Sequence, residues 1–126
     1  MKIPEELQDL LDKKALAHLA TIMPDGSPQV TPVWFDYDGE HFRINSARGR
    51  RKDRNMRRDP RVALSIVDPE SPEHSLCVRG TVVAITTEGA LAHMDTLARK
   101  YRGSGWTPVA DQVRVIYKIR PDWVNG

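Results

Sequence analysis

The stretch 41-HFRINSARGRRKDRNMRRDPRVALSIV-67 decides the fold, because two strand-like runs enclose a strongly basic segment. Residues 41–47 alternate apolar and polar side chains, and residues 61–67 are rich in β-branched residues, as expected of strands. Residues 48–58 between them predict a helix of about three turns. Met56 is its single apolar anchor, and an Asp-Pro pair ends it before the second strand. We therefore expect a strand, a short basic helix and a strand.

Similar strand-like runs continue on both sides of this unit. Asp-Gly turns at 24–27 and 37–40 separate neighbouring runs and predict hairpins. Gly80 predicts a bulge or a bend inside a long run, and Thr87 is the expected cap of a later helix. The predicted strands are 15–23 (where alanines and leucines leave a helix open), 28–37, 41–47, 61–67, 76–86 and 111–120, with further helices at 4–13 and 87–101. The pattern predicts one mainly β domain over residues 1–126, a small closed or partly closed antiparallel barrel with short helices.

The positive charge of the chain is concentrated in one segment. The whole sequence has a net charge of +2, but residues 46–61 hold eight basic and two acidic residues. The remainder, with eleven basic and fifteen acidic residues, is net negative. Nucleic-acid binders usually spread their basic residues more widely and add stacking aromatics, which this segment lacks. No apolar run approaches the roughly 20 residues that span a bilayer. We therefore expect neither nucleic acid nor a membrane to be a partner of this protein. The alternative is that the basic segment forms a patch that binds nucleic acid.

The sequence carries few signs of side-chain catalysis. It has no GxGxxG, Walker A, HExxH or GxSxG motif, its four histidines lack metal-ligand spacing, and no carboxylate pair suggests a general acid and base. We therefore predict no catalytic side chain and no metal ligand, and expect an enzyme of this sequence to use a cofactor. The single cysteine, Cys77, excludes an internal disulfide and fits the reducing cytoplasm. We expect its side chain to be buried.

The start of the basic helix has the character of an anion site. Arg50, Arg51 and Lys52 crowd its first turn, where the helix dipole disfavours cations. Free backbone N–H groups and several cations at one point favour a phosphate. The alternative is a solvated helix in which Asp53 and Arg57 pair at i,i+4.

Three motifs carry a family resemblance: "LATI-x-PDG-x-PQ" from residue 19, "R-x-K-x-x-N" from residue 50 and "RRDPRVAL" from residue 57. The sequence resembles the pyridoxamine-phosphate-oxidase-like split-barrel flavoproteins, in particular the actinobacterial and archaeal branch that uses coenzyme F420, a deazaflavin. The likeness extends more loosely to "VRGTV", "LARKYRG" and "RVIYKIRP". It implies a homodimeric split β-barrel with two cofactor sites at the dimer interface. It also implies an F420-dependent oxidoreductase that transfers hydride between the deazaflavin and a small electron-poor organic substrate.

The resemblance also implies cofactor-binding residues. Arg50 and Lys52 would hold the phosphate, Gln29, Thr31, Pro32 and Val33 would line the ring system, and Asn45, Ser46 and Ala47 would lie beneath the ring and ribityl chain. Arg51 and Arg57, with Arg54 and Arg58, exceed what one phosphate needs and favour the oligoglutamate tail of F420. The alternatives are FMN as cofactor, a non-catalytic flavin or F420 carrier, and ordinary barrel packing for the strand residues. Trp34, Trp106 and Trp123 supply apolar area for the dimer interface.

Overall fold

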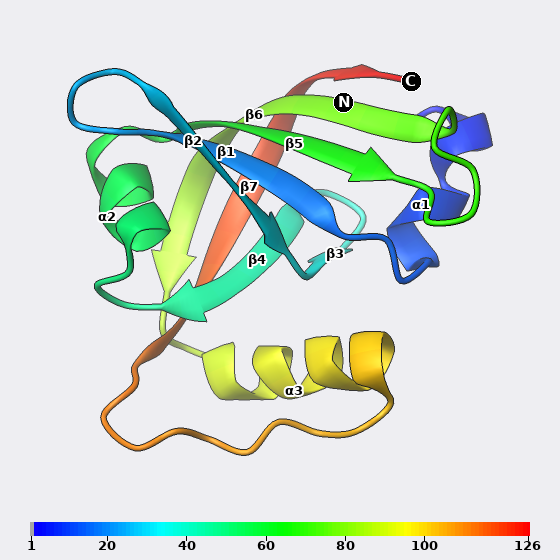
Figure 1. The fold of residues 1–126 in the computed structure, drawn as a ribbon. Helices are drawn as coiled ribbons and strands as arrows, with labels where there is room; N and C mark the ends of the chain where they lie inside the picture. Colours follow the sequence, from blue (N-terminus) through cyan, green and yellow to red (C-terminus); the bar gives the residue numbers. More distant parts are fainter. Residues whose placement is uncertain (1) are drawn as a thin grey trace.

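The computed structural model describes residues 2–126, which form one antiparallel sheet of seven strands in the order β2-β1-β5-β6-β7-β4-β3. The sheet is strongly curled, with α2 at one end and α3 packed beneath it (Figure 1). The strands are β1 Ala17–Ile22, β2 Pro28–Val33, β3 Phe35–Tyr37, β4 Phe42–Ala47, β5 Arg61–Val67, β6 Ser75–Thr86 and β7 Arg114–Asn125; the helices are a 3-10 turn Glu5–Leu7, α1 Asp9–Asp12, α2 Arg51–Arg58 and α3 Ala90–Arg102. The predicted mainly β split barrel is confirmed.

The two edges of the sheet are consecutive in the chain. β2 pairs with β1 and β3 pairs with β4, so the chain changes partner at Trp34, the single residue between the two edge strands. The sheet must curl for one residue to join its two edges. No ladder joins β2 to β3 in residues 2–126, which leaves the barrel split at this seam. The predicted single strand 28–37 is therefore two strands.

Alternate strand residues fill the interior. Phe42 and Ile44 of β4 are fully buried, as their spacing predicted, and lie with Leu64 and Tyr117 in the core. Burial of each large apolar side chain contributes roughly 1.5–3 kcal/mol. Met56 is 1% exposed and anchors α2 to this core, again as predicted.

The bulge predicted at Gly80 is confirmed. The register between β6 and β7 shifts between Arg79 and Gly80, opposite Pro121. A Cβ at Gly80 would lie 2.7 Å from the carbonyl oxygen of Arg120, so only glycine fits this close approach.

Two local predictions were wrong. Thr87 does not cap α3, because the helix begins at Ala90 after Gly89, whose φ of 74° turns the chain into it without a side-chain cap. Cys77 is exposed, because it alternates along β6 with the buried Leu76 and Val78 and so faces outward. Within residues 2–126, no helix has the length and apolar character needed to cross a bilayer.

Candidate functional site

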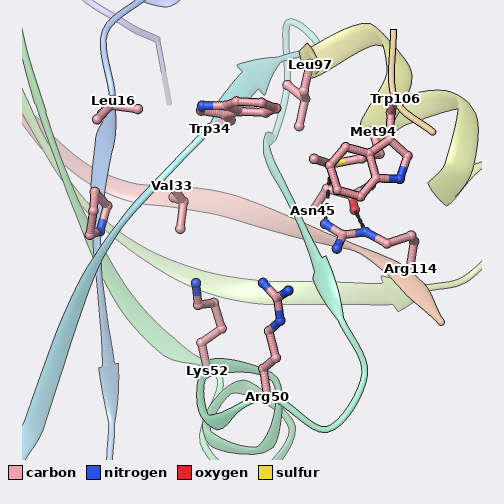
Figure 2. A pocket seen from close by; sticks show the side chains of 11 residues that line it. Leu16, Val33, Trp34, Asn45, Arg50, Lys52, Met94, Leu97, Trp106 and Arg114 are labelled. Atoms are coloured by element: carbon pink, nitrogen blue, oxygen red, sulfur yellow. Dashed lines mark hydrogen bonds between the residues drawn. The ribbon is translucent and has the colours of Figure 1, made fainter. Parts of the chain in front are cut away.

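A cavity of about 350 Å³ lies at the seam of the barrel, between the start of α2 and the inner side of α3. It collects side chains from both ends of the chain, which the fold brings together (Figure 2). Its walls are formed by Leu16, Pro32, Val33, Trp34, Asn45, Arg50, Lys52, Met94, Leu97, Trp106 and Arg114.

Among residues 2–126, three cations face this cavity and no carboxylate lines it. Arg50 and Lys52 rise from the start of α2, and Arg114 reaches in from the start of β7 (Figure 2). Burial lowers the pKa of Lys52, and the neighbouring charges of Arg50 and Arg114 lower it further. Burial and Arg50 likewise lower the pKa of Arg114. Like charges gathered in a partly desolvated space repel one another until an anion binds between them.

Arg114 is the most deeply buried of these cations, at 6% exposed. Its Nε donates to Asn45 Oδ1 at 2.9 Å and its Nη1 donates to Gln112 Oε1 at 3.1 Å. Its guanidinium carbon lies 5.3 Å from the centre of the Trp106 ring, a cation–π contact. All these partners are neutral, so the guanidinium is held in place without a counter-charge. A buried cation of this kind is stabilised by a bound anion.

The first turn of α2 is built so that its one acid points inward. Gly49, with φ of 93°, turns the chain from β4 into the helix. The buried Asp53 accepts a hydrogen bond from the Gly49 N–H at 2.8 Å and from the hydroxyl of Tyr117. Because Asp53 is occupied on the inner side, the outer side of the turn presents Arg50 and Lys52 to the cavity.

The opposite side of the cavity is aromatic and apolar. Trp34 stacks on Tyr101 with ring centres 5.3 Å apart and planes 3° from parallel. Met94, Leu97 and Trp106 continue this surface, and the Trp106 Nε1–H is a buried donor with no partner in residues 2–126. Flat apolar walls beside three cations fit a ligand that joins a planar ring to a phosphate. The donor set therefore suits a flavin or deazaflavin.

Five predicted cofactor-binding residues are brought together here: Pro32, Val33, Asn45, Arg50 and Lys52. The remaining predicted residues, Gln29, Thr31, Ser46, Ala47, Arg51 and Arg57, do not line the cavity. Ser46 is 1% exposed and Ala47 5%, and Ser46 faces the interior because it alternates along β4 with Phe42 and Ile44. Each of these two residues therefore presents only a small part of its surface to a ligand.

The later arginines of α2 have other partners. Arg57 Nε donates to Asp53 Oδ1 at 2.9 Å, as the solvated-helix alternative expected, and Arg57 lines a separate small cavity with Arg48. Arg58 donates to the carbonyl of Ile22 and so fastens α2 to the end of β1.

Six residues of the cavity were missed from the sequence: Leu16, Trp34, Met94, Leu97, Trp106 and Arg114. Trp34 and Trp106 had been expected at a dimer interface, and Trp123 alone of the three tryptophans is exposed, at 37%. Met94 and Leu97 are three residues apart in the predicted helix 87–101 and so share one face of it, and this spacing is the sequence pattern that points to this wall. Arg114 has no local signal, since nothing in its neighbourhood distinguishes it from other strand arginines.

Comparisons with known proteins point the same way. The sequence profile of the pyridoxamine 5'-phosphate oxidase family matches residues 3–126. A solved structure named F420 reductase is 40% identical, with 98% of each chain covered and a TM-score of 0.90. A conserved hypothetical protein from Mycobacterium tuberculosis is 24% identical over 98% of this chain and 83% of its own, with a TM-score of 0.77. HupZ from Group A Streptococcus is 22% identical over 98% and 92%, with a TM-score of 0.70. These last two share the fold.

Proposed function

Because the chain belongs to the pyridoxamine 5'-phosphate oxidase family, we propose that it is an oxidoreductase that binds coenzyme F420 in the seam cavity and transfers hydride between this deazaflavin and a small electron-poor organic substrate. The observation that carries the proposal is the acid-free group of Arg50, Lys52 and Arg114 beside an aromatic wall. The 40% identity to a protein named F420 reductase supports F420 as the cofactor. FMN is the second candidate, because one phosphate would satisfy the same cations.

The side chains of the cavity have distinct roles in this proposal. Arg50 offers a planar fork and Lys52 a point charge to the cofactor phosphate, next to the free N–H groups of the first helical turn. Trp34 and Trp106 shape the space for a planar ring and exclude water from it. When bound, the deazaflavin supplies the hydride donor or acceptor. The protein's contribution is alignment rather than proton transfer, in line with the expectation from the sequence that no side chain acts as a catalytic acid or base.

Fewer arginines of α2 are free to contact the oligoglutamate tail of F420 than the sequence predicted. Arg57 and Arg58 already bind Asp53 and the Ile22 carbonyl. Arg51 and Arg54 of the same helix make no ion pair within residues 2–126, and Arg54 is exposed, so they are the better candidates for an oligoglutamate tail. Gln29, Thr31, Ser46 and Ala47 remain proposed cofactor contacts, the last two through their backbone.

We further propose a homodimer, in which a second subunit closes the open side of the cavity. A groove open at the seam of a small barrel gains a wall from a symmetric partner, and two such sites form per dimer.

The exposed Cys77 is compatible with the reducing cytoplasm as the place of action.

Titration of both cofactors at low and high ionic strength tests the proposal. F420 should bind more tightly than FMN, and the difference should shrink with salt, since exposed charge pairs are screened over about 10 Å at 0.1 M. Arg50→Ala combined with Lys52→Ala should weaken binding of either cofactor by roughly a few hundred- to a few thousand-fold, because each charged hydrogen bond contributes about 1.5–3 kcal/mol.

Arg61→Ala is the matched control, since Arg61 belongs to the same basic segment but is exposed and pairs with Asp59. Equal affinities at low salt, or FMN bound at full occupancy after purification, would favour the FMN enzyme. Tight binding without hydride transfer to any of a panel of electron-poor acceptors would favour a carrier. A double variant that binds like wild type would place the phosphate elsewhere.

A further inference from the structure

A chain of hydrogen bonds leads from the cavity along the face of the sheet on which α3 packs. Arg114 donates to Asn45 Oδ1 at 2.9 Å, and Asn45 Nδ2 lies 3.2 Å from His93 Nδ1. His93 Nε2 lies 3.2 Å from both carboxylate oxygens of Asp36, which also accepts two bonds of 2.8 Å from Arg43. Only the first two members of this chain line the cavity, so the role of His93 in it is indirect.

The partners at the two ends decide how the amide of Asn45 is oriented. A guanidinium can only donate, so the oxygen of Asn45 must face Arg114. The Asn45 Nδ2 donates to the carbonyl of Ala90, the first residue of α3, at 2.8 Å, and a carbonyl can only accept. The second hydrogen of Nδ2 is then directed at His93 Nδ1.

The same reasoning decides the state of His93. Its Nδ1 faces an N–H donor and must carry a lone pair, while its Nε2 faces a carboxylate and must carry the proton. Burial tends to raise the pKa of Asp36, but hydrogen bonds from His93 and Arg43 lower it below its ordinary value, so this carboxyl is an acceptor. His93, only 5% exposed, is thus the neutral Nε2–H tautomer.

We infer that His93 is a positioning residue for the anion site, because it holds Asn45 in the one orientation that aims Arg114 into the cavity. A proton on His93 Nδ1 would oppose the Asn45 N–H. Asn45 would then have to rotate its amide, which would break its bonds to Ala90 and Arg114. The orientation of Arg114 therefore depends on the lone pair of His93 Nδ1. The inference rests on the proposed anion site.

Charged groups approach His93 from each neighbouring element. Asp36 comes from β3, Arg43 from β4, Lys118 from β7 and Glu88 from the segment before α3; Lys100 of α3 interacts with Asp36, and β6 contributes only the uncharged Ala84 and Thr86. Asp36 is the one carboxylate hydrogen-bonded to the ring, and Arg43 neutralises it.

Two variants separate positioning from packing. His93→Leu keeps an apolar side chain in the buried site but leaves the second N–H of Asn45 Nδ2 without an acceptor, and should weaken F420 or FMN binding by roughly tenfold. His93→Gln presents an amide oxygen to Asn45 and an NH₂ group to Asp36, and should retain near wild-type affinity. His74→Gln, at the Asp9 contact beside α1, is the matched control and should bind like wild type.

The tautomer of His93 gives a readout that a packing role would not move. Long-range ¹H–¹⁵N NMR of the cofactor-free protein should show the Nε2–H tautomer of His93.

The outcomes keep the inference apart from the proposed function. An Nδ1–H tautomer or unchanged affinity in His93→Leu would overturn the inference while the cofactor site stands. Wild-type protein that binds neither cofactor would contradict the proposed function. Inorganic phosphate, followed through the NMR signal of the Arg114 Nε–H, is then the probe. The inference stands only if His93→Leu weakens phosphate binding.

Discussion

At the scale of single residues, the charge of Lys52 that we propose for anion binding also lowers the stability of the cofactor-free protein. Its ammonium lies in a partly desolvated cavity beside two other cations, and its pKa is lowered by burial and by Arg50 and Arg114. The unfolded chain, in which Lys52 is solvated, binds this proton more tightly. Below the lowered pKa the charged Lys52 therefore costs folding free energy, and this cost disappears as pH rises toward the ordinary lysine value.

Lys52→Met should therefore raise the free energy of unfolding of the cofactor-free protein near neutral pH. The side chain keeps its apolar stem and loses the repulsion, for a gain of a few tenths to about 1 kcal/mol after solvent screening is discounted. Urea denaturation measures it, with the exposed Lys14→Met as control. Added cofactor should stabilise wild type more than the variant. A less stable Lys52→Met protein would contradict this account of the site.

At the scale of elements, the position of α2 depends on the hydrogen bonds of the buried Asp53. The carboxylate joins Gly49 at the helix start, Tyr117 on β7 and Arg57 one turn further along. Burial raises the pKa of Asp53, but these hydrogen bonds outweigh burial and lower it. The contribution of the ionised group is complete above the unfolded value of about 3.9 and is lost as pH falls through the lower folded value.

Asp53→Asn should destabilise the protein by about 2–4 kcal/mol at neutral pH, because an amide has only one acceptor oxygen. Its NH₂ group must then face either the Gly49 N–H or the donors of Tyr117 and Arg57, and Arg57 loses its counter-charge. Urea denaturation measured from neutral pH into the acid range should also show a shallower loss of stability for the variant than for wild type. Asp25→Asn, in the exposed turn after β1, is the control and should change little. A variant as stable as wild type would mean that Met56, Asn55 and Arg58 hold α2 without a contribution from Asp53.

The elements could be predicted where their signal is local. The alternation of Phe42 and Ile44 and the backbone demand at Gly80 fixed β4 and the bulge of β6 from sequence. The extension of β7 past residue 120 could not be predicted, because Pro121 argues against a central strand. It is accommodated only because it lies opposite Gly80 at the bulge. The break at Trp34 likewise depends on strand pairing and not on residue type.

The site follows the same division. Arg50 and Lys52 were predicted as site residues because a cluster of basic residues is visible in the sequence itself. Arg114 and Trp106 lie more than fifty residues further along the chain and reach the cavity only after β7 has paired with β4 and the segment after α3 has folded back. Arg57 was predicted to bind the cofactor because of its charge alone. In the structure it pairs with the carboxylate of Asp53.

At the scale of the whole molecule, the homodimer is the main prediction. Light scattering at micromolar concentration should show a particle of twice the chain's 14.3 kDa. Trp123 is the candidate for the interface, because it is the exposed tryptophan and stacks against Arg79 at 4.0 Å on the outer face of the sheet. Trp123→Glu should shift the particle toward the monomer. Val109→Glu, in the exposed segment after α3, is the control. A 14.3 kDa particle for wild type would exclude the dimer.

The prolines of β2 have a consequence for aggregation. An edge strand with free N–H groups is a template on which other chains add strands. Residues 28, 30 and 32 alternate along β2, so their backbone amide positions face the same way. Pro28 and Pro32 lack an N–H, and of these three residues only Val30 can donate a hydrogen bond. A continuous ladder cannot grow from this edge, which removes the first step toward amyloid-like stacking. The barrel is therefore able to leave its seam open for a ligand without exposing a strand that seeds fibres.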